Sequence, residues 1–227
     1  MTNTVDLRDV QGLAVKAYAK FGYPKARFVF FRIARDTEGR AFIRKLLPLV
    51  TTGEPWKRGG TLPAATTDIA LTYEGLKRLG VPEMSLHGFP DEFSMGMRAR
   101  RDILDDCGPS DPRYWDPIWD RDEEQSVHVM VALNGFGAQP DVAQRNLDAR
   151  YSQLAEIYAS VSGGVQMLSG HRGPGGEELP YQDASALLEN GRFVPKEHFG
   201  YTDGISLTCF KGSGSTDDDV IGGGKPT

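Results

Sequence analysis

Cysteine is scarce in this sequence, which has two cysteines, Cys107 and Cys209, among 227 residues. They are far apart and form no CxxC pair, which excludes a disulfide-stapled scaffold and a cysteine-based zinc knuckle. We therefore expect two buried thiols in a reducing compartment, which favours a cytoplasmic location. The polar N-terminus, residues 1–8, also lacks the apolar core of a secretory signal.

Long apolar runs and an excess of basic charge are also missing. No stretch approaches the roughly 20 apolar residues that a bilayer-spanning helix needs, so we expect no membrane association. Lysine and arginine number 26 against 31 acidic residues, giving a net charge of −5, and the densest basic stretch is residues 98–101. This balance argues against nucleic acid or an anionic membrane as a partner.

The periodic segments that are present predict an α+β fold. Residues 27–33 form a continuous β-branched and aromatic run that is typical of a central strand, and residues 127–133 alternate with a period of two. One apolar stripe on 37–50 and another on 141–162 predict helices, the second starting at a capping box of Asp141 and Gln144. The predicted order is strand 27–33, helix 37–50, strand 68–72, strand 127–133, helix 141–162 and strand 165–169.

Two such strand-helix-strand units predict a ferredoxin-like antiparallel sheet with both helices on one face. We assign residues 1–210 to this domain and residues 73–122, where the period breaks, to a helical insertion with a proline-rich loop. Residues 211–227 are rich in Gly, Ser and Asp and predict a flexible linker that leads to a further half.

Several familiar catalytic motifs are absent. The glycines before Lys225 lack the Ser or Thr and the spacing of a phosphate loop, and the segment around Ser206 lacks the second glycine of a hydrolase elbow. The four histidines are too scattered to indicate a metal site: they are His87, His128, His171 and His198.

Asp203 stands out because Gly200 and Gly204 flank it. Glycine permits left-handed or closely packed backbone on each side, so this loop can hold a carboxylate against a flat or bulky group. Such a partly desolvated acid can carry a proton between two atoms of a small substrate. The alternative is a turn in which Asp203 bonds only its own backbone.

The segment around Asp203, EHFGYTDGIS, resembles the GxxDG signature of the dye-decolourising (DyP-type) haem peroxidases, which belong to the dimeric α/β-barrel type superfamily. Other blocks resemble the same family in the same order: they are residues 9–12 (DVQG), 26–33, 71–80 (LTYEGLKRLG), 89–100 with its FPDEF and Met97, and the Trp115-Asp116 pair. The similarity therefore runs from Asp9 to Ser206.

This resemblance implies an oxidoreductase that uses hydrogen peroxide to oxidise bulky aromatic reductants such as dyes. Asp203 corresponds to the distal acid, which takes a proton from bound peroxide and returns it to the leaving oxygen. The neighbouring positions correspond to residues that contact haem b: they are Gly200, Tyr201, Thr202, Gly204, Ile205 and Ser206.

The resemblance stops before the second half of the family pattern. The histidine that binds the iron and the arginine that assists the distal acid match nothing in this sequence, and residues 206–208 depart from the usual Ser-Gln-Pro. We therefore interpret the chain as the N-terminal, distal half of a haem peroxidase, which needs a C-terminal half or a second subunit as its partner. Alone it is expected to bind haem poorly and to be inactive. The alternative is a haemless binding or assembly module that retains the fold.

Overall fold

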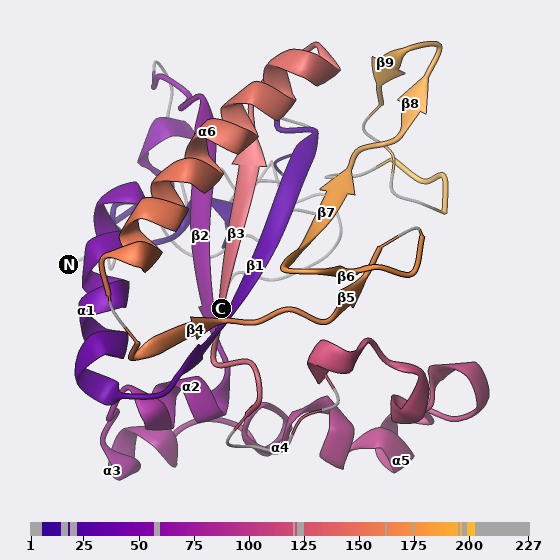
Figure 1. Ribbon diagram of the computed structural model, residues 1–227. Helices are drawn as coiled ribbons and strands as arrows, with labels where there is room; N and C mark the ends of the chain where they lie inside the picture. Colours follow the sequence, from indigo (N-terminus) through magenta and orange to yellow (C-terminus); the bar gives the residue numbers. More distant parts are fainter. Residues whose placement is uncertain are drawn as a thin grey trace, which may run out of the picture.

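The structure is a computed structural model, and it describes residues 6–14, 18, 22–56, 60–119, 121, 125–161, 163–173, 175–194, 196 and 199–202. Its centre is a five-stranded antiparallel sheet in the order β2-β3-β1-β4, with β7 also paired to β1 (Figure 1). The strands are β1 (Lys25–Ile33), β2 (Ala65–Leu71), β3 (Val129–Gly135), β4 (Val165–Met167) and β7 (Tyr181–Ser185). The predicted ferredoxin-like α+β fold is confirmed.

Strand β1 is the axis of this sheet. One edge pairs with β3 from Lys25 to Phe31, while the other edge pairs first with β7 and then with β4. Val29, Phe30 and Phe31 are all buried, so side chains on both faces are covered. The continuous apolar run therefore predicted the central strand correctly.

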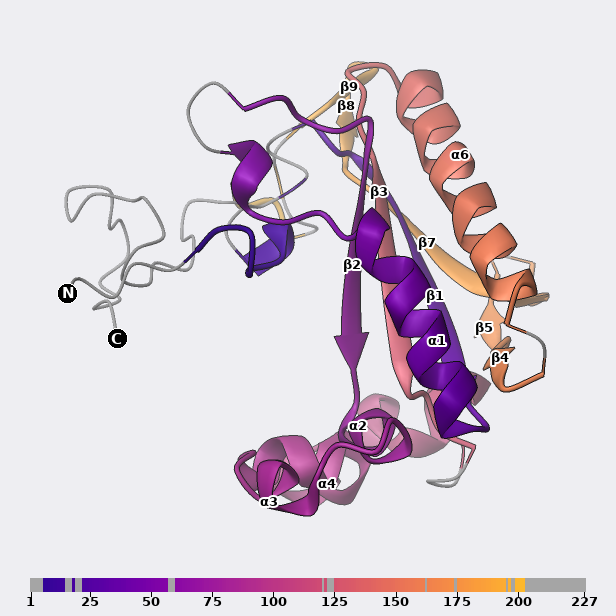
Figure 2. The same ribbon diagram turned by 90° about the vertical axis from the view of Figure 1, so that its left-hand side faces the viewer.

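Helices α1 (Asp36–Leu46) and α6 (Pro140–Ala159) pack on the same face of the sheet, as predicted (Figure 2). Together with the sheet they bury one apolar core: Val29, Phe31, Ile33, Phe42, Leu46, Val129, Val131, Leu133, Leu147, Leu154, Val161 and Val165. The amphipathic period of each helix supplies the side chains that reach it.

Two details of these helices differ from the prediction. Helix α1 ends at Leu46 and continues as a 3₁₀ turn, Leu47–Leu49, because Pro48 has no N–H for the next helical hydrogen bond. The predicted capping box on α6 is wrong: the cap residue is Gln139 and Pro140 starts the helix. Asp141 instead pairs with Arg145 at 2.7 Å.

The segment between β2 and β3 is helical, with α2 (Tyr73–Arg78), α3 (Glu83–Leu86), α4 (Asp91–Ala99) and α5 (Arg101–Leu104), followed by 3₁₀ turns. The Thr72 hydroxyl caps α2 by accepting a hydrogen bond from Gly75 N at 3.0 Å. Gly75 packs so closely on β3 that an added Cβ would lie 2.1 Å from the carbonyl oxygen of His128. Glycine is therefore required where α2 crosses the start of β3.

The chain after β4 forms short strands that the sequence did not predict. β5 (His171–Arg172) pairs with β6 (Glu178–Leu179), β7 joins the main sheet, and β8 (Leu188–Glu189) pairs with β9 (Arg192–Phe193). Beyond β7 the chain leaves the sheet as an extended arm (Figure 1). The division into domain 1–210 and linker 211–227 stays a prediction, because residues 203–227 lie outside the described part.

Among the described residues, the helices include none that is long and apolar enough to cross a bilayer. Cys107 is exposed, so its prediction as a buried thiol is wrong. It follows α5 in a segment whose side chains largely face outward. Cys209 lies outside the described residues.

Candidate functional site

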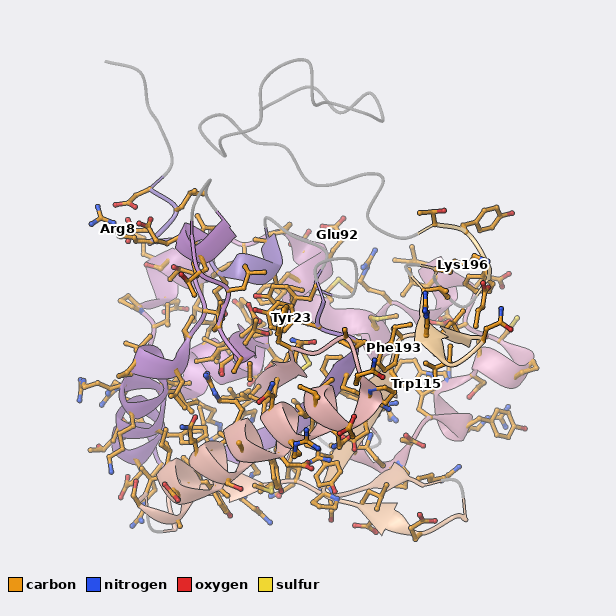
Figure 3. All side chains as sticks on the ribbon, turned by 90° about the horizontal axis from the view of Figure 1, so that it is seen from above. Arg8, Tyr23, Glu92, Trp115, Phe193 and Lys196 are labelled. Atoms are coloured by element: carbon orange, nitrogen blue, oxygen red, sulfur yellow. The ribbon has the colours of Figure 1, made fainter. Side chains whose placement is uncertain are left out.

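The arm ends in a loop that leads directly to Asp203. Lys196 and Thr202 form an isolated antiparallel bridge, and Gly200 between them has a left-handed φ of 93°. The Lys196 Nζ atom also lies 2.6 Å from Glu189 Oε1, which ties the loop to β8. Seen from above, Lys196 lies toward one side of the molecule and Arg8 toward the other (Figure 3).

This loop presents two aromatic side chains to solvent: Phe199 is 90% exposed and Tyr201 is 76% exposed. A Cβ added at Gly200 would meet no atom of the described residues within 4 Å. Open space beside a left-handed glycine, next to outward-facing aromatic rings, is compatible with a flat apolar group lying on the loop.

The structure therefore places three of the predicted site residues, Gly200, Tyr201 and Thr202, on one exposed turn. Asp203, Gly204, Ile205 and Ser206 lie outside the described residues, and so does His198. Their roles stay predictions.

The described histidines do not gather. His87 is exposed and lies 3.6 Å from Glu83 Oε1 through Nε2, whereas His128 and His171 are buried in separate places. The Nδ1 atom of His128 accepts a hydrogen bond from the backbone N–H of Ile33 at 2.9 Å. Within the part of the chain that the structure describes, no group of three or more His, Cys, Asp or Glu side chains is placed to hold a metal ion. Haem contact by this loop and the identity of an iron ligand stay predictions.

A second notable group surrounds Asp68 on β2, which is 4% exposed. Its Oδ1 atom accepts hydrogen bonds from the backbone N–H of Leu13 at 3.3 Å and the hydroxyl of Tyr18 at 3.2 Å. Its Oδ2 atom is buried and has no hydrogen-bond partner among the residues that the structure describes. Burial raises the pKa of Asp68 to about 6, against the opposing effect of these two donors.

The N-terminal block that resembles the family, residues 9–12, docks beside Asp68. The side-chain amide of Gln11 accepts from Ile69 N at 2.7 Å and donates to Ile69 O at 2.9 Å. Gly12 N donates to the carbonyl oxygen of Thr51 at 2.8 Å. This block therefore holds the N-terminal segment against β2 in the described structure.

The sequence analysis missed a third group, around His171. This side chain is 2% exposed, and no described residue lies within ordinary hydrogen-bond distance of either ring nitrogen. Asp116 Oδ2 lies 3.6 Å from Nδ1, and the rings of Phe30 and Trp119 lie 4.8 and 6.4 Å away. Burial lowers the pKa of His171, and the nearby Asp116 charge opposes that shift. The only sequence signal was the Trp115-Asp116 pair, which did not indicate a histidine 55 residues away.

Comparison with solved structures extends these observations. The chain is similar to an ancestral D-type dye-decolourising peroxidase, with 24% identity and a TM-score of 0.65 over 92% of this chain and 40% of the other. It is similar to a dye-decolourising peroxidase from Auricularia auricula-judae, with 19% identity and a TM-score of 0.65 over 93% and 40% of the two chains. A DyP-type peroxidase from Anabaena matches with 17% identity and a TM-score of 0.63 over 88% and 39%.

No protein-family model matches the chain, and no curated protein matches it significantly. The chain spans about two fifths of the length of the solved chains that it matches. The resemblance seen in the sequence is therefore confirmed at the level of the fold, and this chain has the fold of one part of a dye-decolourising peroxidase.

Proposed function

We propose that this chain is the distal part of a haem peroxidase that uses hydrogen peroxide to oxidise bulky aromatic donors. The observation that carries the proposal is the coincidence of two independent features. The fold follows that of dye-decolourising peroxidases over about nine tenths of the chain. The GxxDG segment, residues 200–204, begins on an exposed turn with a left-handed glycine.

In this proposal Gly200, Tyr201, Thr202, Gly204, Ile205 and Ser206 form the surface that faces haem b. The iron supplies the redox chemistry when haem is bound, and its ligand comes from a C-terminal half or a second subunit. Location in the cytoplasm stays a prediction based on the low cysteine content.

Asp203 is the proposed acid-base residue. Hydrogen peroxide is a neutral molecule, so a proton must leave one oxygen and reach the other as the O–O bond breaks. A carboxylate within hydrogen-bond reach of both oxygens moves this proton directly or through one water. The net transfer leaves Asp203 unchanged, because it accepts the proton first and then donates it.

The test is Asp203→Asn in the intact, haem-loaded protein. Asn has the same shape but cannot accept the proton, so we expect the peroxide reaction in stopped-flow mixing to slow by about 10²-fold to 10⁴-fold, with haem content unchanged. Glu156→Gln is the matched control, because Glu156 is an exposed carboxylate on the outer side of α6. It should react like the wild type.

A purely structural role for Asp203 predicts a different result in the same experiment. If Asp203 only shapes a turn, Asn satisfies that turn nearly as well, and the variant reacts within threefold of wild type at about pH 5, where an ordinary carboxylate is ionised. That result would remove the catalytic assignment. Intact protein that folds but takes up no haem would instead favour the haemless binding module.

A further inference from the structure

The N-terminal strap, defined as residues 6–14 together with Tyr18, closes over a buried carboxyl group on β2. Asp68 is 4% exposed, and both hydrogen bonds described for its carboxylate come from the strap. The donors are the backbone N–H of Leu13 at 3.3 Å and the hydroxyl of Tyr18 at 3.2 Å. Figure 2 shows the 3₁₀ turn of the strap, Gly12–Ala14, in indigo on the side of β2 away from α1 and α6. The strap therefore contributes to the burial of Asp68.

Polar contacts hold most of this strap. Gly12 alone is buried within residues 6–14, and Tyr18 is the one large buried side chain among the described residues of the strap. The Gln11 amide accepts a hydrogen bond from Ile69 N at 2.7 Å and donates one to Ile69 O at 2.9 Å. A segment that buries little apolar surface opens at a lower free energy than the core does. The strap can therefore open while the sheet stays folded.

The surroundings of Asp68 supply no positive charge among the described residues. Thr66 and Ala70 share its face of β2, and Ala132 lies opposite it on β3. The charged residues of the strap are exposed: they are Asp6, Arg8 and Asp9. Burial raises the pKa of Asp68 to about 6, opposed only by the two strap donors. An ionised Asp68 thus keeps two neutral donors and no cation, which is costly for a buried charge.

Opening of the strap changes the proton affinity of Asp68. In the closed form its pKa is about 6, whereas a carboxyl group exposed to water has a pKa of about 3.9. The closed form therefore binds the proton more tightly, and this stabilisation of the closed form is complete below about pH 4 and is lost as the pH rises through about 6. We propose that Asp68 is a proton-dependent latch for the strap: the neutral carboxyl keeps the strap closed, and ionisation favours its opening. The latch does not depend on haem or on the proposed peroxidase reaction.

Amide hydrogen exchange in the intact protein tests this latch. The reporters are two amides whose hydrogen bonds join the strap to the rest of the chain: Gly12 N donates to Thr51 O at 2.8 Å, and Ile69 N donates to Gln11. The reference is the N–H of Thr67, two positions earlier on β2, which donates to the Thr51 hydroxyl at 3.1 Å and not to the strap. Protection factors, which correct for the intrinsic pH dependence of exchange, are measured from about pH 4 to about pH 7.5.

We expect protection at Gly12 and Ile69 to fall by at least about tenfold across this range, because a pKa difference of about two units changes the opening equilibrium by up to about 10²-fold. Thr67 should keep its protection. Asp68→Asn stays neutral and keeps an acceptor for both donors, so its protection at Gly12 and Ile69 should not depend on pH. Asp9→Asn, which removes an exposed carboxylate from the same strap, is the matched control and should behave like the wild type.

Protection at Ile69 that stays constant with pH would overturn the proposal. An equal fall at Thr67 would overturn it too, because β2 as a whole would then be opening. A fall in Asp68→Asn as large as in the wild type would assign the pH dependence to another group, with the same consequence. The comparison of Ile69 with Thr67 is made in the wild type, so the test does not depend on how well the variants fold.

Discussion

The two sides of the central sheet differ in how they are completed. On the helix-covered side, Phe31, Val131 and Leu147 are at most 1% exposed and belong to one apolar core. The polar side chains buried beside it, Arg27 and Thr67, have hydrogen-bond partners. The opposite side buries polar residues such as Asp68 and His171, and both keep buried polar atoms with no hydrogen-bond partner among the described residues. Apolar burial stabilises the first side, whereas the second side retains polar atoms whose burial is energetically costly.

This difference separates a side whose burial is favourable from one whose burial carries a polar cost. A core dominated by apolar side chains gains free energy from burial. A buried polar atom that finds no partner loses the hydrogen bonds that it made to water in the unfolded chain. The N-terminal segment and the 3₁₀ turn Pro117–Trp119 cover parts of the second side.

The largest expected effect tests the helix-covered side. Phe42→Ala should lower the free energy of unfolding by about 3–5 kcal/mol, because Phe42 is fully buried and its loss leaves a cavity between α1 and β1. Urea denaturation measures the change. Met84→Ala is the control, since Met84 is 88% exposed and should change stability by less than about 0.5 kcal/mol. A loss below about 1 kcal/mol at Phe42 would contradict the core assignment.

The next prediction tests the opposite side of the sheet by the pH dependence of the unfolding free energy. The pKa of Asp68 is about 6 in the fold and roughly 3.9 in an unfolded chain. The folded state therefore binds this proton more tightly than the unfolded state does, and protonation of Asp68 stabilises the fold. This stabilisation is complete below about pH 4 and is lost as the pH rises through about 6. Relative to Asp68→Asn, the wild type should lose roughly 2–3 kcal/mol of unfolding free energy between about pH 4 and pH 7.

Urea titrations of both proteins across that pH range measure this loss. Stability curves of wild type and Asp68→Asn that stay parallel from about pH 4 to pH 7 would show that Asp68 titrates like an ordinary surface acid.

The smallest effect concerns the edge where β7 joins the sheet. Arg27 is 6% exposed. Its Nε and Nη2 atoms donate hydrogen bonds to the Asp183 carboxylate at 2.7 and 2.8 Å. Its guanidinium carbon lies 3.9 Å from the centre of the Tyr181 ring. Asp183→Asn removes the charge but keeps an acceptor, and the Asp183 side chain is 47% exposed. We expect a loss of about 1–2 kcal/mol.

Hydrogen exchange of the β7 amides is the sharper measurement of this contact. Protection should fall in residues 181–185 and stay unchanged in β3, because Asp183 lies on β7 and its ion pair with Arg27 attaches β7 to β1. Equal loss of protection in β3 and β7 would mean that Asp183 supports the whole sheet instead.

The sequence predicted the helix-covered side well because its signals are local and periodic. The run from Phe28 to Ile33 and the stripe on α6 each encode a buried face within one element. Strand β7 was missed because its residues, YQDAS, are mostly polar and exposed. Its place depends on pairing with β1 and on the Arg27–Asp183 ion pair, which joins residues 156 positions apart.

The candidate site was predicted less completely for the same reason. The glycine spacing around Asp203 indicated a special loop, and Gly200 does adopt left-handed backbone. The contact between Asp116 and His171 joins the end of the helical insertion to β5, and no periodicity encodes it. The burial of Asp68 depends on the N-terminal segment folding back across β2. Such contacts are set by tertiary packing, which overrides local propensity.

The docking of Gln11 on Ile69 has a consequence for the solubility of the protein. Strand β2 lies at the edge of the sheet, where unpaired N–H and C=O groups can recruit a strand from another molecule. Along that edge, Thr51 bonds both the N–H and the C=O of Thr67, and the Gln11 amide does the same for Ile69. Gln11 and Thr51 thereby occupy backbone groups of β2 that an incoming strand would need, which opposes edge-to-edge aggregation at this strand.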